Sequence, residues 1–202
     1  FLYKTTATTV SWSSDYERNS MKSSRELEFV VPHDNFKEAK QFWSDRAIHP
    51  NFIIQYSVEV LELNPQHTYP DVRFLMSPKP GGAQLIAMIF PWEMIEIEPK
   101  NKFECHIDLF EKYAHPQCAK RFQQKQVCEI KSCPFKFNVF ISFYNPNLVF
   151  ESDLFEEKII RLTVPVSDFH NLGYPVHFNQ YIGFESKDNV RISEIKIKEV
   201  YL

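Results

Sequence analysis

Apolar and polar side chains alternate one residue at a time in several separate segments of this chain. The alternation is clearest over residues 103–109 and returns over 54–60, 135–143 and 160–166. Successive side chains of a β-strand point to opposite faces of a sheet, so this period of two predicts strands with one buried and one solvated face. Such strands are typical of antiparallel sheets.

The strands expected from this pattern are short and follow one another at the spacing of an all-β sandwich or barrel. The regular succession of strands and helices that would indicate a parallel sheet does not occur in the sequence. With 44% hydrophobic residues in a total of 202, the chain has enough apolar material for one core. We therefore expect a single domain, residues 1–202, folded as a mainly antiparallel, jelly-roll-like β-sandwich. Its expected strands are 27–31, 52–60, 72–76, 84–90, 94–98, 103–109, 135–143, 160–166, 181–184 and 190–200.

At two places the alternation changes phase: after Val60, and between Ile192 and Ile195. The first change predicts a β-bulge or the end of strand pairing. The C-terminal pattern, Val190-x-Ile192-x-x-Ile195-x-Ile197, resembles the last strand of jelly-roll lectins and galactose-binding sandwiches. The sugar-binding signature of the galectins, His-x-Asn-x-Arg followed by Trp-Gly-x-Glu, is absent, and no family is assigned.

Two segments differ from this pattern. From Asp34 onward, apolar residues recur at helical spacing as far as Trp43 and Ala47, and Asp34 is suited to cap a first turn. We expect an amphipathic helix over 34–47 that packs against one end or face of a sheet. The Ser- and Thr-rich residues 1–24 are expected to form either a leading strand or a loosely held N-terminal arm.

All four cysteines fall in one part of the sequence, and we expect the segment 110–134 to be an insertion that carries most of them. Three interpretations stay open: two disulfides, reduced structural cysteines, or a zinc site held by cysteine and histidine. Disulfides favour an extracellular or secretory location, with the cytoplasm as the alternative. The disulfide or metal candidates are Cys105, His115, Cys118, Cys128 and Cys133.

Composition and motifs exclude several classes of chemistry. With only four glycines, the chain contains neither a P-loop nor a dinucleotide-binding fingerprint. A nucleophile elbow and a His-Glu-x-x-His metal motif are also missing. A net charge of −3 argues against nucleic acid as a partner, and the longest apolar run, 85–90, is too short to span a membrane. Because the chain begins with Phe1, we expect a processed chain or a fragment.

Aromatic residues make up 15% of the chain, and those near turns are candidates for a binding site. A flat ring beside amide side chains offers a stacking surface and hydrogen bonds to a sugar or a peptide. We therefore expect a non-enzymatic, lectin-like recognition module that binds a carbohydrate or protein ligand through loops at one end of the sandwich. Two alternatives stay open: a protein–protein assembly subunit of a larger complex, or a structural zinc protein or metal-dependent enzyme that uses the cysteines and histidine. No catalytic residue is expected, and the expected ligand-binding residues are Trp92, Tyr144, Asn145, Asn147, Tyr174 and His177.

Overall fold

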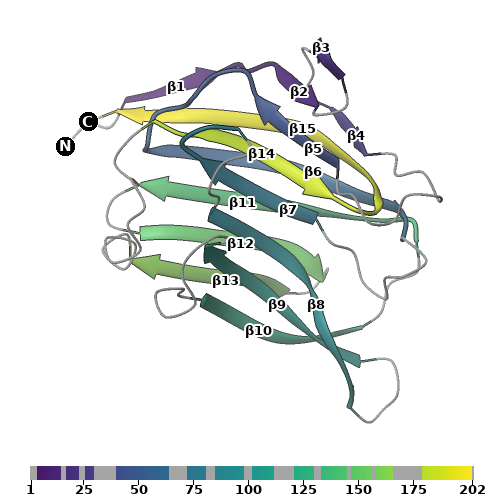
Figure 1. Cartoon of the computed structure of the whole chain (residues 1–202). Helices are drawn as coiled ribbons and strands as arrows, with labels where there is room; N and C mark the ends of the chain where they lie inside the picture. Colours follow the sequence, from purple (N-terminus) through teal and green to yellow (C-terminus); the bar gives the residue numbers. More distant parts are fainter. Residues whose placement is uncertain are drawn as a thin grey trace.

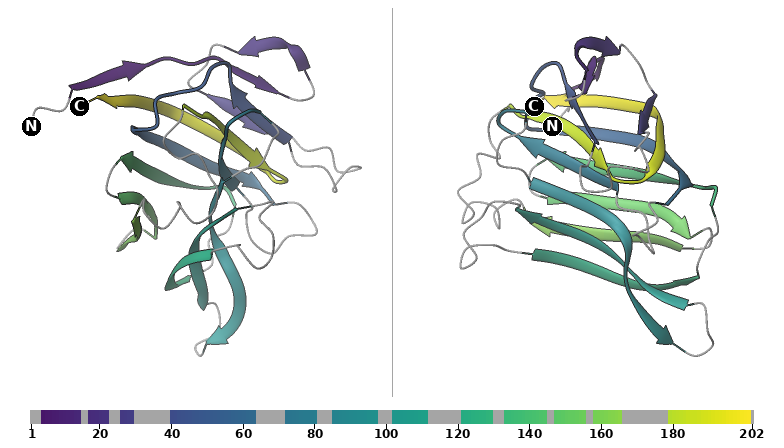
Figure 2. Two further views of the ribbon diagram at one scale, coloured as in Figure 1. Left: turned by 60° about the vertical axis from the view of Figure 1, so that its left-hand side comes forward. Right: turned by 45° about the vertical axis from the view of Figure 1, so that its right-hand side comes forward.

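The protein is described from a computed structural model, in which all described elements are β-strands and no helix occurs among the described residues. The strands form two antiparallel sheets stacked face to face (Figures 1 and 2). This confirms the expected all-β, antiparallel architecture. For 17–22, 85–97, 102–111, 121–129, 144, 154–155 and 158–160 the description covers the backbone and its pairing. The residues described are 4–14, 17–22, 26–29, 40–63, 72–80, 85–97, 102–111, 121–129, 133–144, 147–155, 158–165 and 179–201.

One sheet has seven strands and includes both the first and the last strand of the described chain. Its order, from edge to edge, is β1 (Lys4–Thr8), β15 (Asn189–Tyr201), β6 (Phe52–Glu62), β11 (Phe135–Tyr144), β12 (Asn147–Phe155) and β13 (Lys158–Pro165). The seventh strand, β4 (Leu27–Phe29), also pairs with β15. Lys4 of β1 lies opposite Tyr201 of β15, so the two ends of the described chain lie side by side (Figure 1).

The other sheet has eight strands. Its order is β10 (Arg121–Glu129), β9 (Lys102–Glu111), β8 (Leu85–Ile97), β7 (Val72–Ser77), β14 (Tyr181–Ser186), β5 (Lys40–Ser44), β2 (Trp12–Ser14) and β3 (Glu17–Lys22). Because β1 belongs to the first sheet and β2 and β3 to the second, the N-terminal residues contribute strands to both sheets.

The core lies between the two sheets and is rich in aromatic rings. Tyr56 of β6 meets Phe184 of β14 with ring centroids 4.9 Å apart, and Phe29 of β4 meets Phe42 of β5 at 4.9 Å. Both contacts have edge-to-face geometry, which is favourable for aromatic pairs. Each pair joins one sheet to the other, so these rings help to hold the sandwich together.

The expected helix over 34–47 is wrong where the structure describes it. Residues 40–44 form strand β5, which pairs with β14 on one side and β2 on the other, while 34–39 lie outside the described residues. Phe42 belongs to the core between the sheets, and its neighbour Trp43 is buried as well. Because both faces of β5 are covered here, its residues lack the polar alternation that marks a half-exposed strand.

The expected cysteine-bearing insertion over 110–134 is not supported. Strands β9 and β10 pair with each other at one edge of the eight-stranded sheet. In this pairing Cys105 lies opposite Gln126, and Cys128 lies opposite Phe103. These two cysteines therefore occupy positions in regular strands, and 112–120 lies outside the described residues.

The change of phase after Val60 coincides with an irregular pairing of β6 and β15. Glu62 lies opposite Asn189, whereas Val60 lies opposite Val190, so Leu61 is an extra residue between two adjacent partners. This confirms the bulge expected from the sequence. The second change of phase coincides with a further shift of register in β15, which bears on the site described next.

Candidate functional site

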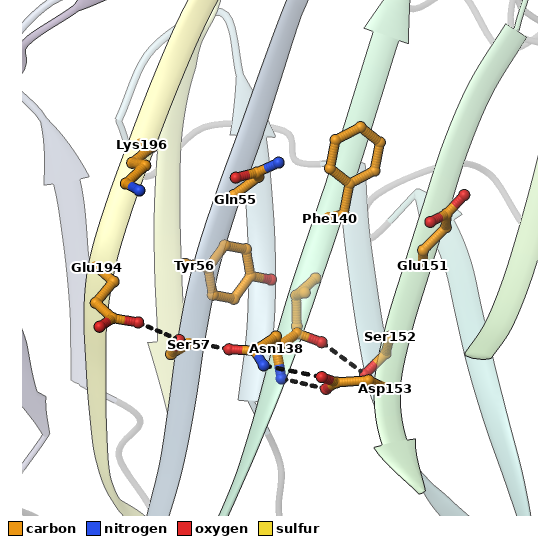
Figure 3. Close-up of a pocket in the computed structure, with 11 residues that line it drawn as sticks. Gln55, Tyr56, Ser57, Asn138, Phe140, Glu151, Ser152, Asp153, Glu194 and Lys196 are labelled. Atoms are coloured by element: carbon orange, nitrogen blue, oxygen red, sulfur yellow. Dashed lines mark hydrogen bonds between the residues drawn. The ribbon is translucent and has the colours of Figure 1, made fainter. Parts of the chain in front are cut away.

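A groove with a volume of about 290 Å³ crosses the outer face of the seven-stranded sheet. It runs over four neighbouring strands, β15, β6, β11 and β12, and its side chains are drawn in Figure 3. The residues that line it are mostly polar or charged, with one phenylalanine on the rim and a tyrosine and a valine that also belong to the core. They are Gln55, Tyr56, Ser57, Asn138, Val139, Phe140, Glu151, Ser152, Asp153, Glu194 and Lys196.

A chain of hydrogen bonds links the four strands across the groove (Figure 3). Ser57 Oγ lies 2.6 Å from Asn138 Oδ1 and 3.0 Å from Glu194 Oε2. On its other side Asn138 donates twice to Asp153, from the backbone N–H to Oδ1 at 2.5 Å and from Nδ2 to Oδ2 at 2.8 Å. Since each of these residues comes from a different strand, only the pairing of the sheet brings them together.

In this network of hydrogen bonds, the acceptors outnumber the donors at Ser57. The hydroxyl of Ser57 carries a single proton, but it lies within hydrogen-bonding distance of two acceptors, Asn138 Oδ1 and Glu194 Oε2. The amide of Asn138 cannot be reversed to supply a donor, because its Nδ2 already donates to the carboxylate of Asp153. One of the two oxygens therefore receives no proton from Ser57 and can accept a hydrogen bond from a ligand.

A second row of residues crosses the same strands one step further along. Lys196 lies opposite Gln55, Gln55 opposite Phe140, and Phe140 opposite Glu151. Glu151 is held by Arg161 of β13, whose Nη2 lies 2.7 Å from Oε1. Among the described residues, the exposed side chains of Gln55 and Lys196 take part in no hydrogen bond or ion pair. They are free donors beside a half-buried aromatic ring.

The groove therefore combines three features on one surface: an acceptor that Ser57 cannot serve, unengaged donors and an apolar ring. Below it, Tyr56 is buried in the core, and this burial raises the pKa of its hydroxyl far above the ordinary value. It stays neutral. The arrangement is suited to a flat ligand with several hydroxyl groups, because such a ligand both donates and accepts hydrogen bonds along its edge.

The structure describes three of the ligand-binding residues expected from the sequence, none of which lines the groove, and only two of these three lie close together. Tyr144 at the end of β11 pairs with Asn147 at the start of β12. Trp92 belongs to β8 of the other sheet. Asn145, Tyr174 and His177 are outside the described residues, and a role for the six remains a prediction.

The cysteine candidates are described in part. Cys133, just before β11, is a half-buried free thiol, so the expected pattern of two disulfides is not confirmed. Burial is the main reason why the pKa of this thiol is raised, and the nearby carboxylates of Asp188 and Glu62 raise it further, so it is not an activated nucleophile. Within the described part of the chain, no group of three or more His, Cys, Asp or Glu residues could hold a metal ion. His115 and Cys118 lie outside that part.

Little in the sequence indicates the groove. Ser57 and Asn138 occupy the polar positions of two alternating strands, where a solvated side chain is the ordinary expectation. The one available signal was the change of phase before Ile195, which marks an irregular strand beside Glu194.

The class of fold is a lectin-like β-sandwich of two antiparallel sheets. The whole chain superposes on the whole of winged bean acidic lectin, solved in complex with methyl-α-D-galactose, with a TM-score of 0.59 and 8% sequence identity. An alginate lyase from Alteromonas is also similar, with a TM-score of 0.50 and 8% identity over 95% of each chain. The enzymatically active domain of tailspike protein 2 of bacteriophage CBA120 has a TM-score of 0.56 and 10% identity, over 94% of this chain and 28% of that one.

These likenesses show that the chain shares a sandwich fold with a lectin and an alginate lyase, in agreement with the expected jelly-roll-like architecture. Comparison of the sequence with protein-family profiles and with curated proteins found no match. Among the described residues, no helix is long and apolar enough to cross a membrane.

Proposed function

We propose that this protein is a carbohydrate-recognition module and that the groove on the seven-stranded sheet is its binding surface. The observation that carries the proposal is the second row of the groove, in which Phe140 lies between the free amide of Gln55 and the carboxylate of Glu151. A sugar ring stacks its C–H face on an aromatic side chain while amides and charged groups bond its hydroxyls.

The fold supports the proposal at a general level. Winged bean acidic lectin, which has a similar sandwich, was solved with methyl-α-D-galactose, and another similar protein is an alginate lyase. The groove is better suited to recognition than to catalysis, because two of its carboxylates are already engaged. Asn138 donates to Asp153, and Arg161 pairs with Glu151. A general acid and base would need carboxylates free to exchange protons with a substrate.

The test is a screen of the purified chain on an array of immobilised oligosaccharides, followed by titration calorimetry with the best soluble glycan. Phe140→Ala and Lys196→Ala are each expected to weaken binding about tenfold, because each removes roughly 1.4 kcal/mol of contact with the ligand. The matched control is Lys198→Ala. Lys198 is exposed on the same strand two residues further on, and it does not line the groove.

An equal loss of affinity in Lys196→Ala and Lys198→Ala would mean that only the general charge of β15 matters. This result would contradict the groove as the binding surface. A wild-type chain that binds nothing on the array but captures a stable protein partner would favour the assembly subunit instead.

The end of the β11–β12 hairpin is a second candidate surface for the same function. Tyr144 and Asn147 occupy paired positions there, and a sugar site commonly combines an aromatic residue with an amide. Tyr144→Ala weakens binding in this case, whereas Phe140→Ala leaves it unchanged.

A module of this kind is proposed to work outside the cell or in the secretory pathway, with the cytoplasm as the alternative. Mass spectrometry of the alkylated protein tests the location, because disulfides among Cys105, Cys118 and Cys128 would form only in an oxidising compartment. Three free thiols in protein taken from its natural source would favour the cytoplasm.

A further inference from the structure

The second irregularity of β15 lies at the edge of the groove and moves one side chain onto its rim. Ser193 lies opposite Ser57 of β6, and the next paired residue, Lys196, lies opposite Gln55, so the strand contains an extra residue in between. Ile195 returns to the core, whereas Glu194 is exposed.

In a regular strand, position 194 would follow an outward Ser193 and would point inward, toward the core. The bulge reverses this and turns the carboxylate of Glu194 out toward Ser57, which lies 3.0 Å away. The groove therefore owes this carboxylate to the irregularity of the strand.

The backbone of Glu194 is strained. Its φ is 54°, in the left-handed region, and among the described residues it is the only one other than glycine with a positive φ. A residue with a Cβ is unfavourable there, and glycine is the residue that adopts this conformation without penalty. Glutamate at this position stabilises the fold less than glycine would, and strain of this kind is concentrated at functional sites.

We propose that Glu194 is a specificity-determining residue of the groove, which accepts a hydrogen bond from a hydroxyl group of the bound sugar. This inference rests on the proposed function. Because Ser57 has one proton for two acceptors, Glu194 Oε2 and Asn138 Oδ1, a ligand hydroxyl supplies the missing donor. A sugar that lacks a hydroxyl at that point leaves a carboxylate without a partner and is rejected.

The test compares two substitutions at this position, Glu194→Gly and Glu194→Gln, on an array of immobilised neutral oligosaccharides and in thermal melts. Glu194→Gly is expected to weaken binding at least tenfold, since it removes the acceptor. It is also expected to leave the melting temperature unchanged or to raise it by up to about 3 °C, since it relieves the strain. Glu194→Gln replaces the carboxylate with an amide whose oxygen still accepts, and its affinity is expected to fall only about threefold.

The charge-matched control is Glu28→Gln. Glu28 is an exposed carboxylate on the same sheet that pairs with Arg191 outside the groove, and its loss is expected to leave binding unchanged. A general effect of negative charge would weaken binding in this variant too and would overturn the proposal.

Three further outcomes separate this inference from the proposed function. If Phe140→Ala weakens binding but Glu194→Gly does not, the groove binds sugar and the role of Glu194 is wrong. If Glu194→Gly lowers the melting temperature by more than about 3 °C, the residue serves the fold, and the inference is again wrong. If the wild-type chain binds no oligosaccharide on the array, both proposals are wrong.

Discussion

The outer faces of the two sheets are built from the same alternation of side chains but differ in their contact with solvent. On the seven-stranded sheet, the outward residues Gln55, Asn138 and Lys196 are exposed. On the eight-stranded sheet, Trp43 of β5 and Leu75 of β7 alternate with core residues, yet they are only 1% and 0% exposed. One sheet therefore has an open outer face, and the other has an outer face that is buried over β5, β14 and β7.

The polar groups of the two faces are arranged accordingly. On the buried face, Trp43 Nε1 donates to Gln41 Oε1 at 2.9 Å, and Gln41 Nε2 donates to Glu185 Oε1 at 2.8 Å. The other carboxylate oxygen of Glu185 lies 3.5 Å from Arg73 Nη1. Each donor there has an acceptor, as burial requires, whereas on the open face the single proton of Ser57 faces two acceptors. Polar groups that are satisfied within the protein indicate a structural role, and acceptors on an open face that the protein's own donors do not fill indicate a place for a ligand.

The largest effect is expected from Glu185→Ala on the buried face. This change leaves Arg73 without its carboxylate and Gln41 without its acceptor, and removing one partner of a buried ion pair costs about 3 kcal/mol. A melting temperature lower by about 9 °C is the expected result in thermal denaturation. Glu185→Gln keeps an acceptor for Gln41 and is expected to lose less stability than Glu185→Ala. A loss below about 1 kcal/mol for the alanine variant would mean that this face is hydrated in solution.

A smaller effect is expected from Gly183→Ala on the same face. A Cβ at this position would lie 2.8 Å from the carbonyl oxygen of Phe42 and 2.9 Å from ring atoms of Trp43, and the backbone atom cannot move aside cheaply. Overpacking of this kind costs about 2 kcal/mol, or roughly 6 °C in melting temperature. Gln55→Ala on the open face is the control, with a change within about 0.5 kcal/mol. An unchanged melting temperature for Gly183→Ala would show that β5 and β14 lie further apart than described.

The same difference explains which strands could be predicted from sequence. Strand β6 is predictable because its outward residues Gln55, Ser57 and Glu59 are polar and alternate with buried apolar residues. Strand β5 was mistaken for part of a helix because Phe42 and Trp43, on opposite faces, are both buried. Strand β12 was missed because Ser152, 2% exposed, takes an inward position after Leu148 and Phe150, which shortens the apolar alternation.

The candidate site could not be predicted from the sequence, for a different reason. Ser57 lies 81 positions from Asn138 and 137 positions from Glu194, and no local pattern relates residues at those separations. They meet because β6 pairs with β11 on one side and with β15 on the other. The groove can be predicted only when the register of these three strands is known.

An intermediate effect, dependent on pH, is expected at Glu199, a buried carboxylate of β15 at the end of the sandwich. Burial acts to raise its pKa, but hydrogen bonds from His49 N–H, Thr8 and Tyr201 and the charge of Arg46 outweigh it, so the pKa is lowered from 4.5. The ionised form therefore stabilises the fold above pH 4.5, and this contribution is lost as the pH falls through the lower pKa of the folded state.

The variant Glu199→Gln measures this contribution. It is expected to be about 1.5 kcal/mol less stable than the wild-type chain at pH 7, and the difference is expected to shrink as the pH falls below 4.5. Urea denaturation at pH 7 and pH 3 checks it. A difference that stays constant between the two pH values would mean that the carboxylate is not ionised in the folded protein.

The smallest effect is expected from Arg161→Ala on the open face, and it is the sharpest test of the contrast. The distance of 2.7 Å between Arg161 Nη2 and Glu151 Oε1 is shorter than the one between Arg73 and Glu185, so distance alone would rank it as the stronger pair. Solvent reverses the ranking, because Arg161 is 61% exposed and an exposed pair contributes at most about 0.5 kcal/mol. Thermal denaturation should show a shift of no more than about 2 °C. A loss as large as that of Glu185→Ala would mean that the outer face of the seven-stranded sheet is also covered, and a covered groove could not receive a sugar.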